Sequence, residues 1–285
     1  MKCVFSSEWD SHARETYKAN FGEYPHGDIT KIDPDDIPSF DILVGGFPCQ
    51  PFSSIGQRKG FDHPTQGTLF FEIVKILSRP DKPKAFLLEN VKGLTHHDGG
   101  RTWKIIQETL DSIGFNIVFN KVLDAADFGV PQKRERIYII GFRKDLGITD
   151  KDFGSPSPRK RTGIGSFVES GVADRSISTH LQQAYIYKKD DGRPEVITPT
   201  SDFAVKTLVS SYHKIQRLTG TFVADGPTGL RLLTENECKA IMGFPKDFKV
   251  PVSRTQMYRQ FGNSVAVPVV RLLASEIKRL LDSTK

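Results

Sequence analysis

The chain has 285 residues, enough for one large domain or for one large and one small domain. Its 40 basic and 34 acidic residues leave a net charge of +6, which is compatible with a polyanionic partner but does not identify one. Three cysteines without a C-x-x-C pattern argue against a disulfide framework and against a metal site. No apolar run approaches the roughly 20 residues of a membrane helix and no signal peptide is evident, so we expect a cytoplasmic protein with no membrane partner.

The first half of the chain alternates short apolar runs with helical patterns. In chain order, we expect strands at residues 2–6, 40–46, 83–91, 115–124 and 134–143, interspersed with helices at 11–21, 67–79 and 102–114. This alternation is typical of an α/β fold with a mostly parallel sheet. In such sheets, functional side chains collect at the carboxyl ends of the strands.

The pattern changes at about residue 145. Residues 145–225 are rich in Ser, Thr, Gly and Lys and have weak periodicity, so we expect a second, smaller domain with irregular structure. Regular patterns return at 230–244, where Thr234 is a predicted N-cap and Glu237 has the capping-box offset, and in a predicted helix at 264–283. The expected domains are therefore 1–144 together with 226–285, and 145–225.

Cys49 has two interpretations. Most free cysteines are small buried hydrophobic residues. Cys49, however, follows a predicted strand and the pair Gly45-Gly46 in "FDILVGGFPCQPFSS", and Arg58 and Lys59 lie close enough in sequence to favour a thiolate. The competing interpretation is a nucleophile at the edge of a sheet.

Other element ends also have a structural and a functional interpretation. Glu89 in "AFLLENV" is either a cap or loop contact, or an acid whose pKa is raised in a cleft. Arg134 and Arg136 in "PQKRERIYIIGF" share one strand face, and they are either a solvated charge run or a clamp for an anion or a base edge. Asn263, which we expect to open the last helix, is either a cap or part of a pocket lining.

The start of the chain bears on cofactor binding. A doubly wound cofactor fold opens with a strand, a glycine-rich turn and a helix, and an acid about 20 residues later binds the ribose hydroxyls. Here a strand followed by an acid, "CVFSSEWD", starts at residue 3. If Glu8 is that acid, the glycine loop belongs before residue 1. The G-x-G at 163–165 follows no predicted strand and is no substitute.

Several segments, in this order, resemble the DNA (cytosine-5) methyltransferases. They are "SSEWD", "GDI", "GGFPCQPFS", "GTLFFEI", "ENV", "QKRERIY", a variable region, "LTENECKAIMGFP" and "YRQFGNSVAVPV". The resemblance implies a Rossmann-like, S-adenosylmethionine-dependent methyltransferase sheet with a smaller target-recognition domain. It also implies methyl transfer to C5 of a cytosine flipped out of duplex DNA, in an enzyme of the restriction-modification type with a cognate endonuclease as a partner.

The resemblance also implies residue roles. Cys49 corresponds to the nucleophile that adds to C6, Glu89 to the acid that binds N3 and the exocyclic amine, and Arg136, with Arg134 beside it, to the group that holds the base carbonyl. Two further sets of positions correspond to binding residues. The cofactor set is Glu8, Trp9, Asp28, Ile29, Pro48, Leu69 and Asn263, and the DNA set is Gln50, Ser53, Arg58, Lys59 and Thr207.

Two departures from the family pattern matter. The family's first strand and Phe-x-Gly-x-Gly loop have no counterpart in these residues, so we expect methyl transfer to require that segment, either fused to the chain or supplied by a second polypeptide. Gln66-Gly67 replaces the usual Arg-Gly. The competing functions are a DNA-binding remnant without catalysis and an RNA cytosine-5 methyltransferase, and a recognition region of about 80 residues favours DNA over RNA.

Overall fold

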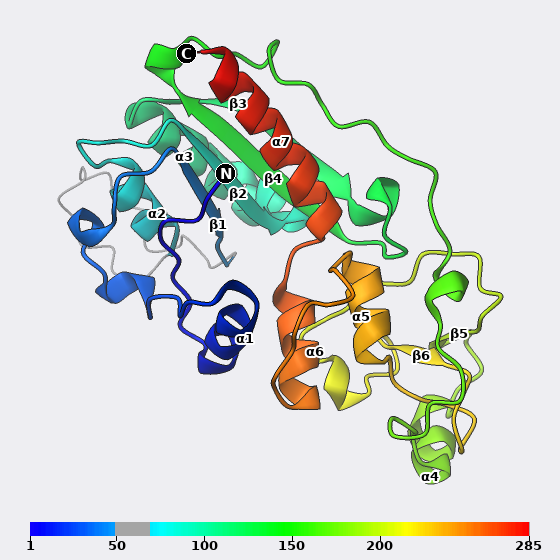
Figure 1. Cartoon of the computed structure of the whole chain (residues 1–285). Coiled ribbons are helices and arrows are strands. Elements are labelled where there is room, and N and C mark those ends of the chain that lie inside the picture. The colour runs from blue at the N-terminus through cyan, green and yellow to red at the C-terminus, as the bar shows by residue number, and fades with distance from the viewer. Residues whose placement is uncertain (49–68, 285) are drawn as a thin grey trace.

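The structure is a computed structural model that describes residues 1–48 and 69–284, and it has a larger and a smaller lobe (Figure 1). The larger lobe contains a four-stranded sheet, and three helices contribute to its packing. These elements are β1 (Ile42–Gly46), α2 (Leu69–Leu77), β2 (Ala85–Val91), α3 (Arg101–Ser112), β3 (Phe115–Asp124), β4 (Glu135–Arg143) and α7 (Val267–Ser283). The first helix, α1 (Ser11–Phe21), lies beside α6 (Arg254–Asn263) of the smaller lobe in the view of Figure 1.

The sheet has the order β1-β2-β4-β3 and is mixed, so the expectation of a mostly parallel sheet was wrong. β1 and β2 are parallel because α2 lies in the connection between them, whereas β4 is antiparallel to both β2 and β3. Residues 125–134, which join β3 to β4, contain one short 3₁₀ turn and no crossover helix. Such a connection permits only an antiparallel return.

Alternation along the strands divides the core between two helical layers. Phe86 and Leu88 of β2 pack with α2 and α3 on one face, and Leu87 packs with α7 on the other. Glu89 follows Leu87 by two residues and therefore lies on the same face of the sheet as Leu87. The hydrophobic period therefore sets which face of the sheet the carboxylate occupies.

The expected strand at residues 2–6 is not present. The neighbouring Ser7 forms one isolated bridge with His26, and Val4 within the segment is half exposed. Without a neighbouring strand, the β-like composition of these residues is not enough to form a ladder.

The smaller lobe contains three helices and a two-stranded parallel sheet around its own core. They are α4 (Thr179–Leu181), β5 (Glu195–Ile197), β6 (Thr221–Val223), α5 (Glu235–Met242) and α6 (Arg254–Asn263). The capping box of Thr234 and Glu237 is confirmed. The core runs from Ile164 to Phe261, so packing places α5 and α6 in this lobe, while the functional boundary at residue 225 stays a prediction.

Asn263 does not open the last helix, as the sequence suggested. It is the final residue of α6, and Ser264 caps that helix in an extended conformation. The last helix begins at Val267, with a proline in its first turn, where the missing N–H costs no hydrogen bond. Among the described residues, no helix has the length and apolar character needed to cross a membrane.

Candidate active site

Glu89 lies at the edge of the sheet where the parallel strands β1 and β2 both end. The register pairs it with Gly46, and a Cβ on Gly46 would lie 3.3 Å from Glu89 Oε2. The glycine thus leaves room for the carboxylate against the β1 backbone. Cys49, three residues after Gly46, lies outside the described residues, and so do Gln50, Ser53, Arg58 and Lys59.

Arg136 reaches the same point from the antiparallel strand. Its backbone pairs with Val91, and its Nε lies 3.0 Å from Glu89 Oε1. The two side chains are 17% and 19% exposed, so each still faces solvent on one side. Burial raises the pKa of Glu89, although the Arg136 and Arg134 charges oppose the shift. The carboxyl group is therefore set to exchange a proton close to a cationic hydrogen-bond donor.

Asn90 is a site residue to which the sequence assigned no role. Its buried Nδ2 donates to the Phe47 carbonyl oxygen at 2.9 Å, and its Oδ1 accepts from the Val91 N–H at 2.8 Å. The first bond fixes the backbone that leads from β1 toward Cys49. The available signal was the amide in "ENV", directly after a buried strand.

Arg134 is oriented differently from Arg136. Its side chain is buried, and its Nη atoms donate to the carbonyl oxygens of Leu208 at 3.2 Å, Gly262 at 3.0 Å and Ser264 at 2.6 Å. Burial, followed by repulsion from Arg136, lowers the pKa of Arg134 to about 10. These contacts fit a positioning role between the lobes, and the catalytic assignment stays a prediction.

Residues 131–134 and 205–208 together form a connection that we call the lobe bridge. The backbone N–H of Lys133 donates to the Val205 carbonyl at 2.8 Å, and the Thr207 hydroxyl donates to the Lys133 carbonyl at 2.7 Å. Gln132, fully buried and missed by the sequence reasoning, accepts from the Leu208 N–H and donates to the Ile241 carbonyl, both at 2.8 Å. The predicted DNA contact Thr207 therefore contributes to joining the lobes.

The predicted adenosine-binding residues come together near the N-terminus. Glu8 N–H donates to the His26 carbonyl at 2.8 Å, which places Glu8 and Trp9 beside Asp28 and Ile29. Asp28 caps a 3₁₀ turn, and hydrogen bonds from the Thr30 backbone and hydroxyl lower its pKa. The chemistry of this set fits adenosine, because Glu8 can accept from ribose hydroxyls and Trp9, 77% exposed, offers an aromatic face.

The other cofactor positions occupy two places. Phe47 and Phe70 pack with ring centroids 5.5 Å apart, which brings the adjacent Pro48 and Leu69 to the same end of β1. Asn263 is exposed at the end of α6. In the described part of the chain, no cluster of His, Cys, Asp or Glu side chains is arranged to hold a metal ion.

The described cysteines are poor nucleophile candidates. Cys238 is fully buried, and burial raises the pKa of its thiol well above the usual value. Cys3 is exposed, and its Sγ donates to the Phe5 carbonyl at 3.3 Å in the N-terminal segment. Neither lies on the sheet edge that carries Glu89.

The family model for C-5 cytosine-specific DNA methylases matches residues 1–279. The chain belongs to this family. It is 56% identical to the Type II methyltransferase M.BsuFI of Bacillus subtilis and 59% identical to M.MspI of Moraxella sp, in each case over 98% of this chain. The chain spans 68% and 66% of the lengths of these two relatives. Enzymes of this family use S-adenosylmethionine as the methyl donor.

Solved structures support the fold. A DNMT2 variant of Spodoptera frugiperda is 24% identical with a TM-score of 0.76, and the match covers 98% of this chain and 92% of that one. Dnmt2 methyltransferase of S. pombe is 20% identical with a TM-score of 0.73, covering 99% and 91%. Together with the family model, these likenesses confirm the predicted α/β methyltransferase fold, although its sheet is mixed and not mostly parallel.

Proposed function

We propose that this chain is a DNA (cytosine-5-)-methyltransferase of the restriction-modification type. Its substrate is a cytosine flipped out of duplex DNA, and its methyl donor is S-adenosylmethionine. The observation that carries the proposal is the Glu89–Arg136 pair, 3.0 Å apart, beside Gly46 on the strand that leads to Cys49. The names of the relatives, Type II methyltransferases, support the restriction-modification context.

The proposed chemistry divides the Glu89–Arg136 pair between two edges of the base. Arg136 turns to the base carbonyl, while the Glu89 carboxyl, whose pKa is raised by burial, holds a proton at N3 and accepts from the exocyclic amine. The Cys49 thiolate forms a bond to C6, and the displaced electron pair makes C5 a nucleophile. S-adenosylmethionine, when bound, would supply the methyl group to C5 and leave as the thioether once its own S–CH₃ bond breaks. C5 then loses its proton, and the bond between the Cys49 sulfur and C6 breaks to release the thiolate.

The proposal includes partners and a location. Glu8, Trp9, Asp28 and Ile29 would hold the adenosine part of the methyl donor, and Pro48, Leu69 and Asn263 would complete the pocket. The methionine part would be held by a strand and Phe-x-Gly-x-Gly loop, fused to the chain or supplied by a second polypeptide. Duplex DNA is the substrate, a cognate endonuclease is the biological partner, and the reaction takes place in the cytoplasm.

Covalent trapping tests the function directly. Duplex DNA containing 5-fluorocytosine is incubated with S-adenosylmethionine and the chain, with and without a peptide that carries the strand and loop. Fluorine at C5 cannot leave as a proton does, so we expect a denaturation-resistant protein–DNA adduct. Cys49→Ala should abolish the adduct, whereas the matched control Cys3→Ala should retain it.

The other outcomes separate the alternatives. Duplex binding without an adduct under any condition would indicate a DNA-binding remnant. Adduct formation that is suppressed by tRNA and not by unmodified duplex DNA would indicate an RNA methyltransferase.

A further inference from the structure

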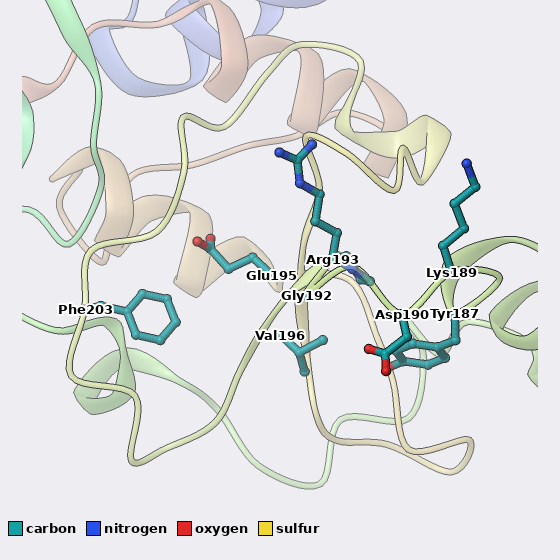
Figure 2. Close-up of a pocket in the computed structure, with 9 residues that line it drawn as sticks. Tyr187, Lys189, Asp190, Gly192, Arg193, Glu195, Val196 and Phe203 are labelled. Carbon is teal, nitrogen blue, oxygen red and sulfur yellow. The ribbon is translucent and has the colours of Figure 1, made fainter.

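Residues 186–194 of the smaller lobe form an exposed loop beside a hollow of about 630 Å³. Tyr187, Lys189, Arg193, Glu195 and Phe203 contribute to its lining (Figure 2). We propose that this 186–194 loop is a target-reading element, in which Arg193 binds the edge of a guanine and Lys189 binds a DNA phosphate. The inference rests on the proposed function and adds residues that choose the site.

A buried arginine organises the loop. Arg217 is 7% exposed, and its guanidinium donates to the Ile186 carbonyl at 2.8 Å and the Lys189 carbonyl at 2.8 Å, and also to the Arg193 carbonyl at 3.2 Å. It also forms a two-pronged pair with Asp191. One side chain thus binds three backbone carbonyls and one carboxylate along eight residues, which compensates for the absence of regular structure.

The far end of the loop is fixed as well. Glu195 Oε1 accepts from the Lys206 N–H at 3.0 Å and from the Thr221 hydroxyl at 2.6 Å. Glu195 also begins β5, which pairs with β6. The loop is therefore attached to the lobe core through Arg217 along its length and through β5 at its C-terminal end.

The charged tips of the loop are available to a partner. Arg193 and Lys189 are exposed and form no ion pair with any carboxylate in residues 1–48 or 69–284. The hydrogen bond from Arg217, and more weakly the Arg193 charge, lowers the pKa of Asp191. The Asp191 carboxylate therefore stays ionised, and its negative charge is compensated by Arg217 within the loop. In Figure 2, Lys189 and Arg193 extend to the same side, whereas Asp190 extends the opposite way.

The surroundings match a nucleic-acid surface. Tyr187 and Phe203 are 50% and 41% exposed beside these cations, and exposed aromatic rings next to arginine and lysine suit bases and phosphates. Thr207, the contact expected from the sequence, has its hydroxyl engaged by the lobe bridge instead. The 186–194 loop therefore combines a backbone fixed by Arg217 with the exposed side chains of Arg193 and Lys189, which can donate hydrogen bonds to DNA.

The two cations are suited to different roles. A guanidinium can donate two parallel hydrogen bonds to guanine O6 and N7, whereas an ammonium is a point charge better matched to phosphate. The Arg193 backbone is fixed on both sides, because its N–H donates to Asp191 Oδ1 at 3.1 Å and its carbonyl accepts from Arg217. A fixed backbone is what a geometric readout requires.

The test uses selection for binding, so it does not depend on catalysis. The full chain is bound to a randomised duplex library, and the bound DNA is sequenced for the unaltered chain and for Arg193→Ala, Arg193→Lys, Lys189→Ala and Lys214→Ala. Arg193→Ala and Arg193→Lys should each lower the preference for guanine at one target position by about 5- to 150-fold. Arg193→Lys keeps the charge, so its salt dependence should not change.

The controls separate readout from electrostatics. Lys189→Ala should weaken binding to all sequences alike and reduce the slope of log affinity against log salt by about 0.9, while Lys214→Ala, an exposed lysine outside the loop, should preserve the preference. An unchanged preference at every position in both Arg193 variants would overturn the proposal. If the unaltered chain does not methylate DNA, but its binding preference for guanine still depends on Arg193, the proposed function would be contradicted and the loop assignment would stand.

Discussion

The sheet edge and the 186–194 loop show two ways to hold functional side chains in place. At the sheet edge, strand register between β1, β2 and β4 places Glu89 and Arg136 together, and buried hydrophobic layers fix that register. In the loop, the buried Arg217 holds backbone carbonyls that have no strand partner. Chemistry that must not vary thus lies on the sheet, and the loop can change its exposed residues without disturbing the core.

The smaller lobe contains a second buried arginine that, like Arg217, binds groups of an irregular segment. Arg231 is fully buried, and its Nη atoms pair with Glu237 at 2.9 Å while its Nε donates to Asp225 at 2.8 Å. The Arg231 hydrogen bond holds the pKa of Asp225 far below its ordinary value. Glu237 also caps α5, so a single ionic cluster links a loop to a helix end.

The largest expected effect is on catalysis at the sheet edge. Glu89→Gln keeps the shape but loses the proton that must be held at N3, so kcat should fall by about 10²- to 10⁴-fold. Target preference should not change, because the 186–194 loop is intact. Steady-state methylation at saturating DNA and cofactor measures kcat, and sequencing of bound DNA measures the target preference. A changed preference would break the separation between the two regions.

The next effect is on the stability of the smaller lobe. Arg231→Met leaves Glu237 buried without its partner, and it should lower the free energy of unfolding by about 3–5 kcal/mol. Urea denaturation measures this change in the free energy of unfolding. Lys104→Ala, which removes an exposed i,i+4 pair with Glu108, is the matched control and should change stability by less than about 0.5 kcal/mol. Equal losses in the two variants would show that the buried cluster has no special role.

An intermediate effect is expected at the lobe bridge. Arg134→Lys keeps the charge but cannot reach three carbonyl oxygens, so the lobes should be less well aligned, and kcat should fall by roughly 10- to 100-fold. Guanine preference in the binding selection should be retained. Arg143→Lys, at the other end of β4, is the control and should leave kcat near that of the unaltered chain. A loss of guanine preference in Arg134→Lys would mean that the lobe bridge also determines the position of the 186–194 loop.

The smallest effect is a pH dependence. Burial raises the pKa of Glu89 in the folded chain above its ordinary value of 4.5, so between these two values the folded state binds more protons than the unfolded state. As pH rises through that window, the unaltered chain should lose stability relative to Glu89→Gln, which does not titrate there. Parallel urea titrations from pH 4 upward measure the difference. A difference that grows in favour of the unaltered chain would mean that Arg136 outweighs burial.

Local patterns in the sequence predicted most elements but not how they pair. The strand at 115–124 agrees with β3, and the apolar run that begins "AFLLENV" placed Glu89 at a strand end. The strand directions failed because they depend on whether a connection contains a helix, and residues 125–134 do not. The family resemblance supplied the roles of Glu89 and Arg136, which charge pattern alone left open.

Contacts between distant segments were beyond the sequence. Arg134 and Gly262 are 128 positions apart, and nothing in "QKRER" distinguishes a buried arginine that binds carbonyls from one that faces a base. Arg217 in "SSYHKIQRLTG" is typical of a solvated surface charge until its partners are seen. Only the long-range hydrogen bonds distinguish a buried arginine that binds backbone carbonyls from an arginine that faces solvent or a base.

Nucleoside mass spectrometry shows which atom of the base receives the methyl group. Duplex DNA is incubated with the chain, the peptide that carries the strand and Phe-x-Gly-x-Gly loop, and S-adenosylmethionine with a deuterated methyl group, and is then digested. We expect deuterated 5-methyl-2′-deoxycytidine, absent with Cys49→Ala and present with Cys3→Ala. A labelled methyl group on the exocyclic amino nitrogen of a base, or no labelled nucleoside at all, would contradict the proposed C5 methylation.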